Sequence, residues 1–284
     1  MASKELAEVD INPFSPESQN IEKTKRFSTP NERKRVSAYT GRLGRDGYVI
    51  IERAINLEKV KTVRDEFHRL HKGLAKGSSE FGGFQTERLY NLVARTRVLD
   101  ELLLHRDVLA IIETHLDDQI QLSISSSVNL LPGETAQAFH RDDGYYPIAR
   151  PHEPLSVNTM WAIDDFTSDN GATMIIPKSH LLADEHPLSD AAIEIAEMPA
   201  GSVMLWDGSL FHAGGSNKTK YARLGITNIY CRAWLRQQEN QFLGVPPALA
   251  KELDRPLQKL VGYWVANNFL GYLNESSPSL LLKD

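Results

Sequence analysis

The sequence predicts a mainly β protein with flanking helices, whose core is a jelly roll: a double-stranded β-helix of two antiparallel layers. Between residues 120 and 130 apolar side chains alternate with polar ones, and Pro132-Gly133 ends the run, which indicates a half-buried strand. Further short β-prone runs are separated by turn signals at residues 169–171, 199–201 and 214–217. Because the chain shows no long alternation of helix and strand, an antiparallel jelly roll is favoured over a parallel sheet.

The N-terminal segment, residues 1 to about 36, is polar and mixed in charge, with three prolines and a small basic cluster at residues 33–35. Such a segment buries too little apolar surface to offset the entropy lost on ordering. We therefore expect a mobile tail, followed by one domain over residues 37–284.

Helices are expected ahead of the core, over about residues 55–116, where they would buttress one side of the sheet. After a short strand at residues 48–51, apolar residues from Leu57 to Leu70 recur at intervals of three and four, which is typical of an amphipathic helix. A second apolar helical face covers about residues 98–116.

The jelly-roll core is expected over about residues 120–235, and a segment of helix and loop over residues 236–284. The strands are predicted at residues 120–130, 137–141, 155–163, 173–176, 203–206 and 224–231. In the last segment we predict a helix over residues 248–260 that Pro256 breaks or kinks. Aromatic stretches around residues 263–273 pack on the sheet or line a pocket.

Composition and the first residues favour a cytoplasmic protein over a binder of nucleic acid or membrane. The net charge is −5 and the pI about 6.0, whereas a nucleic-acid binder would carry a basic excess. The single cysteine, Cys231, excludes an intrachain disulfide and suits a reducing compartment. The first residues lack an apolar run of signal-peptide length, and no run reaches the roughly 18 apolar residues of a membrane helix.

The motif Gln137-Ala-Phe-His-Arg-Asp-Asp-Gly144 carries the strongest chemical signal. In an extended strand, residues two apart point the same way, so His140 and Asp142 would face a common point. His212, after the apolar strand 203–206, would complete the two-His-one-carboxylate triad that holds Fe(II) and leaves positions open. Asp143 should point away from Asp142 and is interpreted as structural.

The spacing of these motifs resembles the phytanoyl-CoA dioxygenase family of Fe(II)/2-oxoglutarate oxygenases. Arg223 stands eleven residues after His212, which gives the order His-x-Asp, His, Arg. Residues 170–180 are similar to the family's loop between the metal motifs, and Pro199-Ala-Gly-Ser-Val203 is typical of the approach to the distal histidine. The resemblance covers about residues 43–235.

The resemblance implies a metal centre and a cosubstrate site. His140, Asp142 and His212 would bind Fe(II), with 2-oxoglutarate on two further positions through its keto oxygen and C1 carboxylate, and O2 on the last. Arg223 would bind the far carboxylate through its planar fork of donors. Thr173 would donate a hydroxyl to the same carboxylate, and Gln137 would lie near the C1 end.

Four aromatic residues complete the candidate set. Trp161 faces either the cosubstrate or the core. Tyr145 and Tyr146, just after the metal carboxylate, are candidates for substrate contact, although aromatic packing explains them as well. Phe84 is a third candidate for substrate contact, because residues 81–90 are a possible pocket wall.

The resemblance further implies oxidation, by default hydroxylation, of an unactivated C–H bond in a small, largely apolar molecule such as a secondary metabolite. 2-Oxoglutarate and O2 would become succinate and CO2. Desaturation, epoxidation or rearrangement would use the same ligands. Asp142 disfavours halogenation, because related halogenases lack this carboxylate. The protein is expected to be a monomer or a homodimer.

Three other readings remain open. A phytanoyl-CoA-type hydroxylase would need a basic patch for the CoA phosphates, for which Lys59, Lys61 and Arg64 are candidates. A cupin-like metal protein could bind or isomerise a ligand without 2-oxoglutarate, but it would have no use for Arg223. An intact triad counts against a catalytically silent binding protein.

Overall fold

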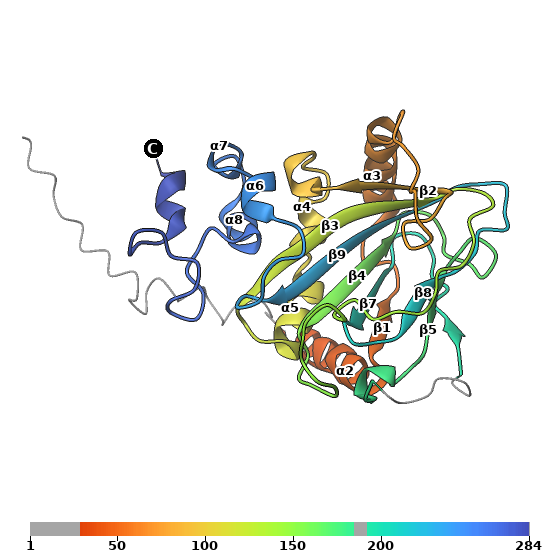
Figure 1. Ribbon diagram of the computed structural model, residues 1–284, viewed down its shortest axis with the longest axis horizontal. Coiled ribbons are helices and arrows are strands. Elements are labelled where there is room, and N and C mark those ends of the chain that lie inside the picture. Colours follow the sequence, from red (N-terminus) through yellow and green to blue (C-terminus); the bar gives the residue numbers. More distant parts are fainter. Residues whose placement is uncertain (1–28, 185–191, 284) are drawn as a thin grey trace, which may run out of the picture.

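The computed structural model describes residues 29–184 and 192–283 (Figure 1). The predicted tail lies outside the described residues up to residue 28, but its last part is helical. Helix α2 (Pro30–Asp46) starts with a capping box in which Thr29 and Glu32 each accept a hydrogen bond from the other's backbone N–H. Only Val36 and Leu43 are buried on this helix. Its apolar face is too sparse to stand out in the sequence, and the predicted boundary at residue 36 is therefore too late.

The larger sheet has six strands in the order β1-β7-β4-β9-β3-β2, and every neighbouring pair is antiparallel. The strands are β1 (Tyr48–Ile51), β2 (Thr86–Tyr90), β3 (Ile120–Leu130), β4 (Ser156–Ala162), β7 (Val203–Asp207) and β9 (Arg223–Arg232). All but β2 were predicted within one or two residues. Strand β2 was missed because its charged residues interrupt the alternation of apolar and polar side chains.

The smaller sheet has the order β6-β5-β8, with β5 (Thr173–Ile175), β6 (Glu194–Ile195) and β8 (His212–Gly214). Residues 137–141 were predicted as a strand but form only an isolated bridge to β8, between His140 and His212. Pairing stops there because the backbone N–H of Asp142 turns to the carbonyl of Gly208, at 2.9 Å. The alternation of side chains survives, since both ends of this short segment pair with β8.

Two apolar cores lie on opposite faces of the larger sheet. Val203 and Leu205 of β7 belong to the core between the sheet and the helices. Met204 and Trp206, on the other face of β7, belong to the core between the two sheets, together with Ile175 of β5. This arrangement confirms the predicted jelly roll: two antiparallel layers around an inner core, with helices packed outside.

Strand β3 is buried on both faces rather than one. Its register shifts between Leu122 and Ile124. As a result Ile120 and Leu122 belong to the core under the helices, whereas Ile124 faces the inner side of the jelly roll. The alternating serines are covered as well: Ser127 Oγ lies 2.7 Å from Nε2 of His71, at the end of α3.

The outer layer consists of α3 (Leu57–Leu70), η1 (Leu92–Ala94), α4 (Asp100–Leu103) and α5 (Arg106–His115). The predicted helix over 98–116 is thus two helices, separated at His105, whose Nδ1 accepts a hydrogen bond from the backbone N–H of Val108 at the start of α5. Beyond the end of β9 lie α6 (Gln241–Gly244), α7 (Pro247–Ala250), α8 (Arg255–Val261) and η3 (Pro278–Leu282) (Figure 1). Pro256 occupies the first turn of α8, so it starts this helix instead of kinking a longer one.

Within the described residues, no helix is both long and apolar enough to cross a membrane.

Replacing Phe67 by Ala tests the packing of α3 on the sheet. Phe67 is fully buried in the outer core and contacts the ring of His71 edge-on. Loss of a buried phenyl ring costs about 3–5 kcal/mol. We expect the free energy of unfolding, measured by urea denaturation, to fall by that amount; a loss below about 1 kcal/mol would contradict this packing.

Candidate metal centre and cosubstrate pocket

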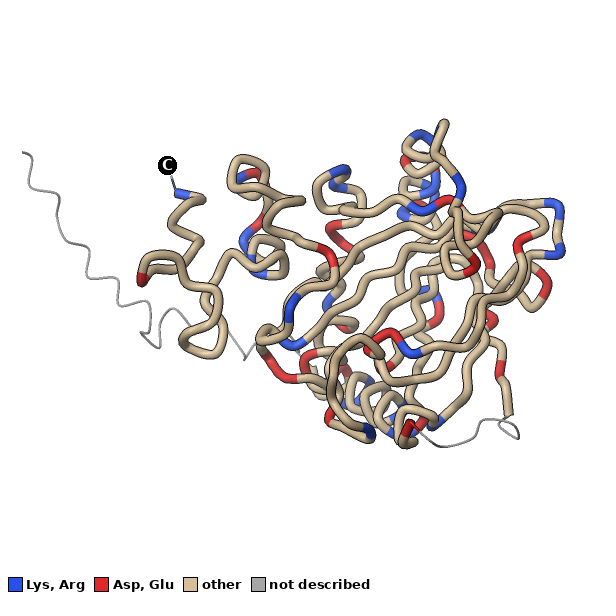
Figure 2. The backbone as a smooth tube through the Cα atoms, viewed as in Figure 1, with Lys and Arg blue, Asp and Glu red and all other residues tan. Residues whose placement is uncertain are grey.

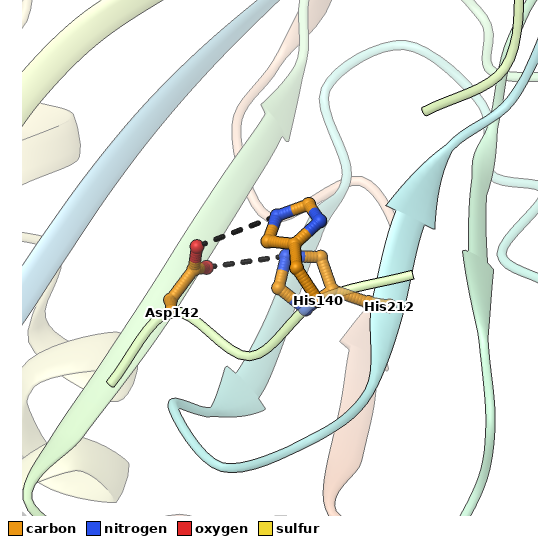
Figure 3. Close-up of side chains that lie close together, drawn as sticks. All are labelled: His140, Asp142 and His212. Atoms are coloured by element: carbon orange, nitrogen blue, oxygen red, sulfur yellow. Dashed lines mark ion pairs between the residues drawn. The ribbon is translucent and has the colours of Figure 1, made fainter. Parts of the chain in front are cut away.

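Three side chains from two distant motifs converge at the inner face of the jelly roll (Figure 3). His140 and Asp142 come from the segment before β4, and His212 opens β8. One ligand atom from each of the three lies within 4.8 Å of the other two. Nε2 of His212 is 3.1 Å and Nε2 of His140 is 3.6 Å from a carboxylate oxygen of Asp142.

Both imidazoles are oriented by backbone carbonyls two residues earlier in the chain. Nδ1 of His140 is 3.0 Å from the carbonyl oxygen of Ala138, and Nδ1 of His212 is 3.0 Å from that of Leu210. A proton on each Nδ1 leaves the Nε2 lone pairs free on the side facing Asp142. Two imidazoles and one carboxylate, with further positions open, are the donor set of a non-haem Fe(II) site.

The carboxylate of Asp142 is held by Asn158 of β4, whose side-chain amide donates to it. Burial raises the pKa of Asp142, but the imidazoles of His212 and then His140 outweigh burial and hold this pKa below its usual range. For His140, burial and then the charge of His212 lower the pKa of the imidazole. The ionised carboxylate and the neutral His140 are the forms that bind a metal cation.

The triad opens into a pocket of about 300 Å³, here called the metal pocket. It lies on the inner face of β3, β4 and β9, and its mouth carries the ring of Phe81, whose centroid is 5.0 Å from that of His140. Besides the triad, its walls include Arg88, Met160, Thr173, Trp206, Arg223 and Ile229.

Arg223 is the most unusual side chain of the metal pocket. It is 3% exposed, and one of its terminal nitrogens donates to the carbonyl of Gly171 at 2.7 Å. Its Nε and Nη1 have no hydrogen-bond partner within the described chain. Burial, and then the charge of Arg88, lower the pKa of this guanidinium to about 9. A buried cation with unused donors is costly on its own, so the geometry fits an anionic ligand.

Arg88, which the sequence analysis missed, brings a second cation to the same pocket. It lies on β2 opposite Val128 of β3, and its Nε donates to the carbonyl of Gly82 at 3.2 Å. Burial lowers the pKa of Arg88, against the opposing charge of Asp142. Finding it required recognition of β2, whose alternation is masked by three polar residues in a row.

Thr173 and Gln137 also line the metal pocket. The amide of Gln137 is already engaged: its Nε2 donates to the carbonyl of Phe81 at 2.8 Å, and its Oε1 accepts from the backbone N–H of Gly214 at 2.9 Å. Gln137 therefore fixes the segment around Phe81 against β8 and has one amide hydrogen left for a ligand.

The four aromatic candidates do not line the metal pocket. Trp161 is fully buried in the outer core, because Asn158 and Met160 take the inner face of β4 and odd-numbered residues take the other. Tyr146 packs beside Leu155 and Cys231 and donates to the carbonyl of Arg236 at 3.1 Å, with Tyr145 against its ring.

Phe84 is 53% exposed and lies outside the metal pocket, whose mouth is formed instead by Phe81, three residues earlier. Residues 263–273 do not reach the metal pocket either. Sequence reasoning identified the right segment around residue 81 but could not choose among its aromatic residues without the turn geometry.

Asp143 is structural, as the sequence indicated. Its carboxylate is fully buried and accepts from Arg150 and from the hydroxyl of Ser209. The backbone N–H groups of Asp142 and Asp143 both donate to the carbonyl of Gly208. A Cβ at Gly208 would lie 2.1 Å from Ser156 Oγ, so glycine permits the close packing of this turn on the start of β4.

Comparison with known proteins places this arrangement in a family. Residues 43–225 match the family model described as phytanoyl-CoA dioxygenase (PhyH). Dioxygenase FUM3 of Gibberella moniliformis is 29% identical over 294 residues, which cover 93% of this chain and 96% of that protein. Dioxygenase aneA of Aspergillus aculeatus is 31% identical over 260 residues, covering 81% and 85%.

Solved structures share the fold. The epimerase SnoN, in complex with Fe3+, alpha ketoglutarate and nogalamycin RO, aligns with a TM-score of 0.63 at 19% identity, covering 74% of this chain and 90% of that one. HygX from Streptomyces hygroscopicus, with nickel and 2-oxoglutarate bound, gives a TM-score of 0.59 at 15% identity, covering 74% and 89%.

A jelly roll that holds a His–Asp–His cluster beside a buried arginine defines a non-haem metal oxygenase. The chain belongs to the phytanoyl-CoA dioxygenase family, which confirms the resemblance stated from its motifs. It is an enzyme of the non-haem iron, 2-oxoglutarate-dependent class, and its substrate is a small molecule.

The role of Asn158 can be measured through metal affinity. Asn158→Ala removes the donor that orients Asp142, and groups of this kind are worth about ten- to a hundredfold in metal binding. We expect the Fe(II) dissociation constant, measured by competition with a chelator, to rise by that factor. Asn129→Ala is the matched control, because its amide binds Glu87 outside the metal pocket. Equal iron affinity in the two variants would contradict the orienting role.

Proposed function

We propose that the protein hydroxylates an unactivated C–H bond of a small, largely apolar secondary metabolite, while 2-oxoglutarate and O2 become succinate and CO2. The observation that carries the proposal is the buried guanidinium of Arg223, which lines the metal pocket together with the triad. Its two unused donor atoms fit the far carboxylate of a dicarboxylic acid whose other end is at the metal.

Each part of the metal pocket has a distinct task in this reaction. His140, Asp142 and His212 hold the metal, and iron bound there would supply the activation of O2. Arg223, with Thr173 beside it, fixes the far carboxylate. Arg88 adds positive charge near Asp142, which favours a second carboxylate close to the metal. Met160 and Ile229 keep the remaining wall apolar, which suits a substrate C–H bond.

The acyl-CoA alternative is disfavoured, because the basic residues suggested for the CoA phosphates are already paired. Lys59 pairs with Glu101, Lys61 with Asp65 and Arg64 with Asp164. All three basic residues lie on α3, which packs on the outer side of the larger sheet, opposite the metal pocket. A CoA thioester bound at the triad would therefore find these charges neutralised and on the wrong side of the sheet.

A cupin-like protein without 2-oxoglutarate is disfavoured by Arg223, because such a protein would bury an unpaired cation for no ligand. The relatives support natural-product chemistry: SnoN is from nogalamycin biosynthesis, and HygX has been solved with hygromycin B bound.

Location and assembly complete the proposal. Basic and acidic positions are intermixed along the described part of the backbone, which gives no reason to expect nucleic acid or membrane as a partner (Figure 2). A buried free Cys231 suits the cytoplasm. Exposed apolar side chains at Leu243, Tyr272 and Leu273 favour a homodimer over a monomer. Sedimentation equilibrium should give twice 31.9 kDa; a single species of 31.9 kDa would exclude the dimer.

The cosubstrate assignment is tested by visible spectroscopy under anaerobic conditions. Adding 2-oxoglutarate to the Fe(II)-loaded protein should give a weak charge-transfer band in the green region, and His212→Ala should abolish it. Arg223→Met removes charge-assisted hydrogen bonds of about 1.5–3 kcal/mol each, so the 2-oxoglutarate concentration at half-maximal band should rise roughly a hundredfold.

Arg232→Met on the same strand is the control, since Arg232 pairs with Asp117 at the other end of β9. If iron binds but no band forms, the cupin-like alternative is correct. If Arg223→Met and Arg232→Met behave alike, the carboxylate lies elsewhere.

A further inference from the structure

A second hollow, of about 330 Å³, lies between the C-terminal segment and the end of the larger sheet. We call it the distal hollow; its walls include Gln121, Arg236, Gln238, Phe242, Trp264 and Leu270. Trp264 and Leu270 belong to residues 263–273, which the sequence suggested as a possible pocket wall; they line this hollow rather than the metal pocket.

The two hollows are neighbours on one continuous surface. Gln238 lines both of them. The register shift in β3 lets Gln121 line the distal hollow and Ile124 the metal pocket, on the same inner side of the sheet. Ile124 pairs with Ile229, which also pairs with Asn158, the residue that holds Asp142. The distal hollow therefore begins roughly 10 Å along β3 from Ile124, three residues at about 3.3 Å each, and Ile124 lies two strands from Asn158.

The segment that separates the hollows is held firmly except at Gln238. The backbone N–H of Gln238 donates to Ser123 Oγ at 2.9 Å, and the side chain of Gln237 donates to the carbonyl of Leu122 at 2.9 Å. The side-chain amide of Gln238 is exposed and makes no hydrogen bond within the described chain. It is thus the one part of this partition that can turn aside or bind a ligand passing from one hollow to the other.

The size of the metal pocket requires such an extension. At about 300 Å³ it is at the lower limit for small-molecule sites, which span roughly 300–1,000 Å³. A five-carbon dicarboxylate must occupy the Arg223 end of it. Little room remains for a substrate as large as a typical secondary metabolite, unless that substrate also fills the distal hollow.

The residues that line the distal hollow indicate which chemical group the far end of the substrate carries. Phe242, Trp264 and Leu270 offer apolar and aromatic surface, and Arg236 is the only charged residue among its described walls. No hydrogen bond or ion pair engages the guanidinium of Arg236 within the described chain, although its carbonyl is held by Tyr146. An available cation above an apolar wall fits a carboxylate on a hydrocarbon frame.

Building on the proposed function, we infer that the substrate is an elongated, largely apolar carboxylic acid. The C–H bond to be oxidised lies at the triad, the chain passes Gln238, and the carboxylate pairs with Arg236 in the distal hollow. The metal pocket and the distal hollow then bind the two ends of one substrate molecule.

Linear alkanoates serve as molecular rulers for this inference. The protein is loaded with Fe(II) and 2-oxoglutarate anaerobically, and hexanoate or dodecanoate is titrated by calorimetry while the charge-transfer band is recorded. We expect dodecanoate to bind at least tenfold more tightly than hexanoate, which is too short to span both hollows, with the band retained. Dodecanamide, of equal length and without charge, should bind about tenfold more weakly than dodecanoate.

Two variants and one control test where the ligand lies. Arg236→Gln should weaken dodecanoate about tenfold, whereas Arg255→Gln, an exposed arginine of α8 outside the hollow, should not. Gln238→Trp should remove the advantage of dodecanoate over hexanoate by filling the passage. Arg236→Gln and Arg255→Gln, both outside the metal pocket, should keep the wild-type band with 2-oxoglutarate, and circular dichroism checks that Gln238→Trp is folded.

The outcomes separate this inference from the proposed function. Absence of the band in the wild-type protein means that the proposed function fails. A normal band with equal affinities for hexanoate and dodecanoate, or for dodecanoate and dodecanamide, overturns the elongated acid alone. Loss of the band on adding dodecanoate shows that the acid displaces 2-oxoglutarate from the metal, which also overturns the inference.

Discussion

Two reciprocal backbone hydrogen bonds between His140 and His212, each of 3.0 Å, hold the candidate metal centre together. They join a segment before β4 to a strand that follows some 70 residues later, and they set the distance between the two imidazoles. Gly208 adds the third constraint by accepting from the backbone N–H of Asp142. Because backbone atoms make these links, the geometry depends on the fold and is available before any metal binds.

A separate, electrostatic constraint acts on the metal pocket. The inner face of the jelly roll carries two carboxylates, Asp142 at the triad and the buried Glu134, and two arginines, Arg88 and Arg223, that lack ion-pair partners among the described residues. Buried cations without counter-ions are destabilising, so the pocket is complementary to a doubly charged acid rather than to water. The folded protein thus carries a destabilising arrangement of charges, which a dianion and a divalent cation would neutralise together.

Much of this could be predicted from the sequence. The strand pattern and the order His-x-Asp, His, Arg depend on local alternation and on residue types that few other structures need, so they identified the jelly roll, His140, Asp142, His212 and Arg223. The sequence left Trp161 open between the cosubstrate and the core because both faces of β4 are buried, so alternation does not show which face a residue takes.

Other features depend on tertiary structure alone. Arg88 lies on a strand whose charged sequence shows no alternation, and Asn158 matters only because β4 passes behind Asp142. The register shift in β3 turns one face of a regular pattern to the other side of the sheet, which no periodicity reveals. The distal hollow exists because residues 236–240 cross that strand, far along the chain from it.

The central claim, that His140, Asp142 and His212 hold iron while Arg223 holds the far end of 2-oxoglutarate, is tested most directly by diffraction from crystals grown anaerobically with Fe(II) and 2-oxoglutarate. Anomalous scattering at the iron absorption edge should show one peak bonded to Nε2 of both histidines and to the Asp142 carboxylate, with the ligand's far carboxylate on Nε and Nη1 of Arg223. An iron peak away from these three side chains, or a ligand that leaves Arg223 unpaired, would contradict the account.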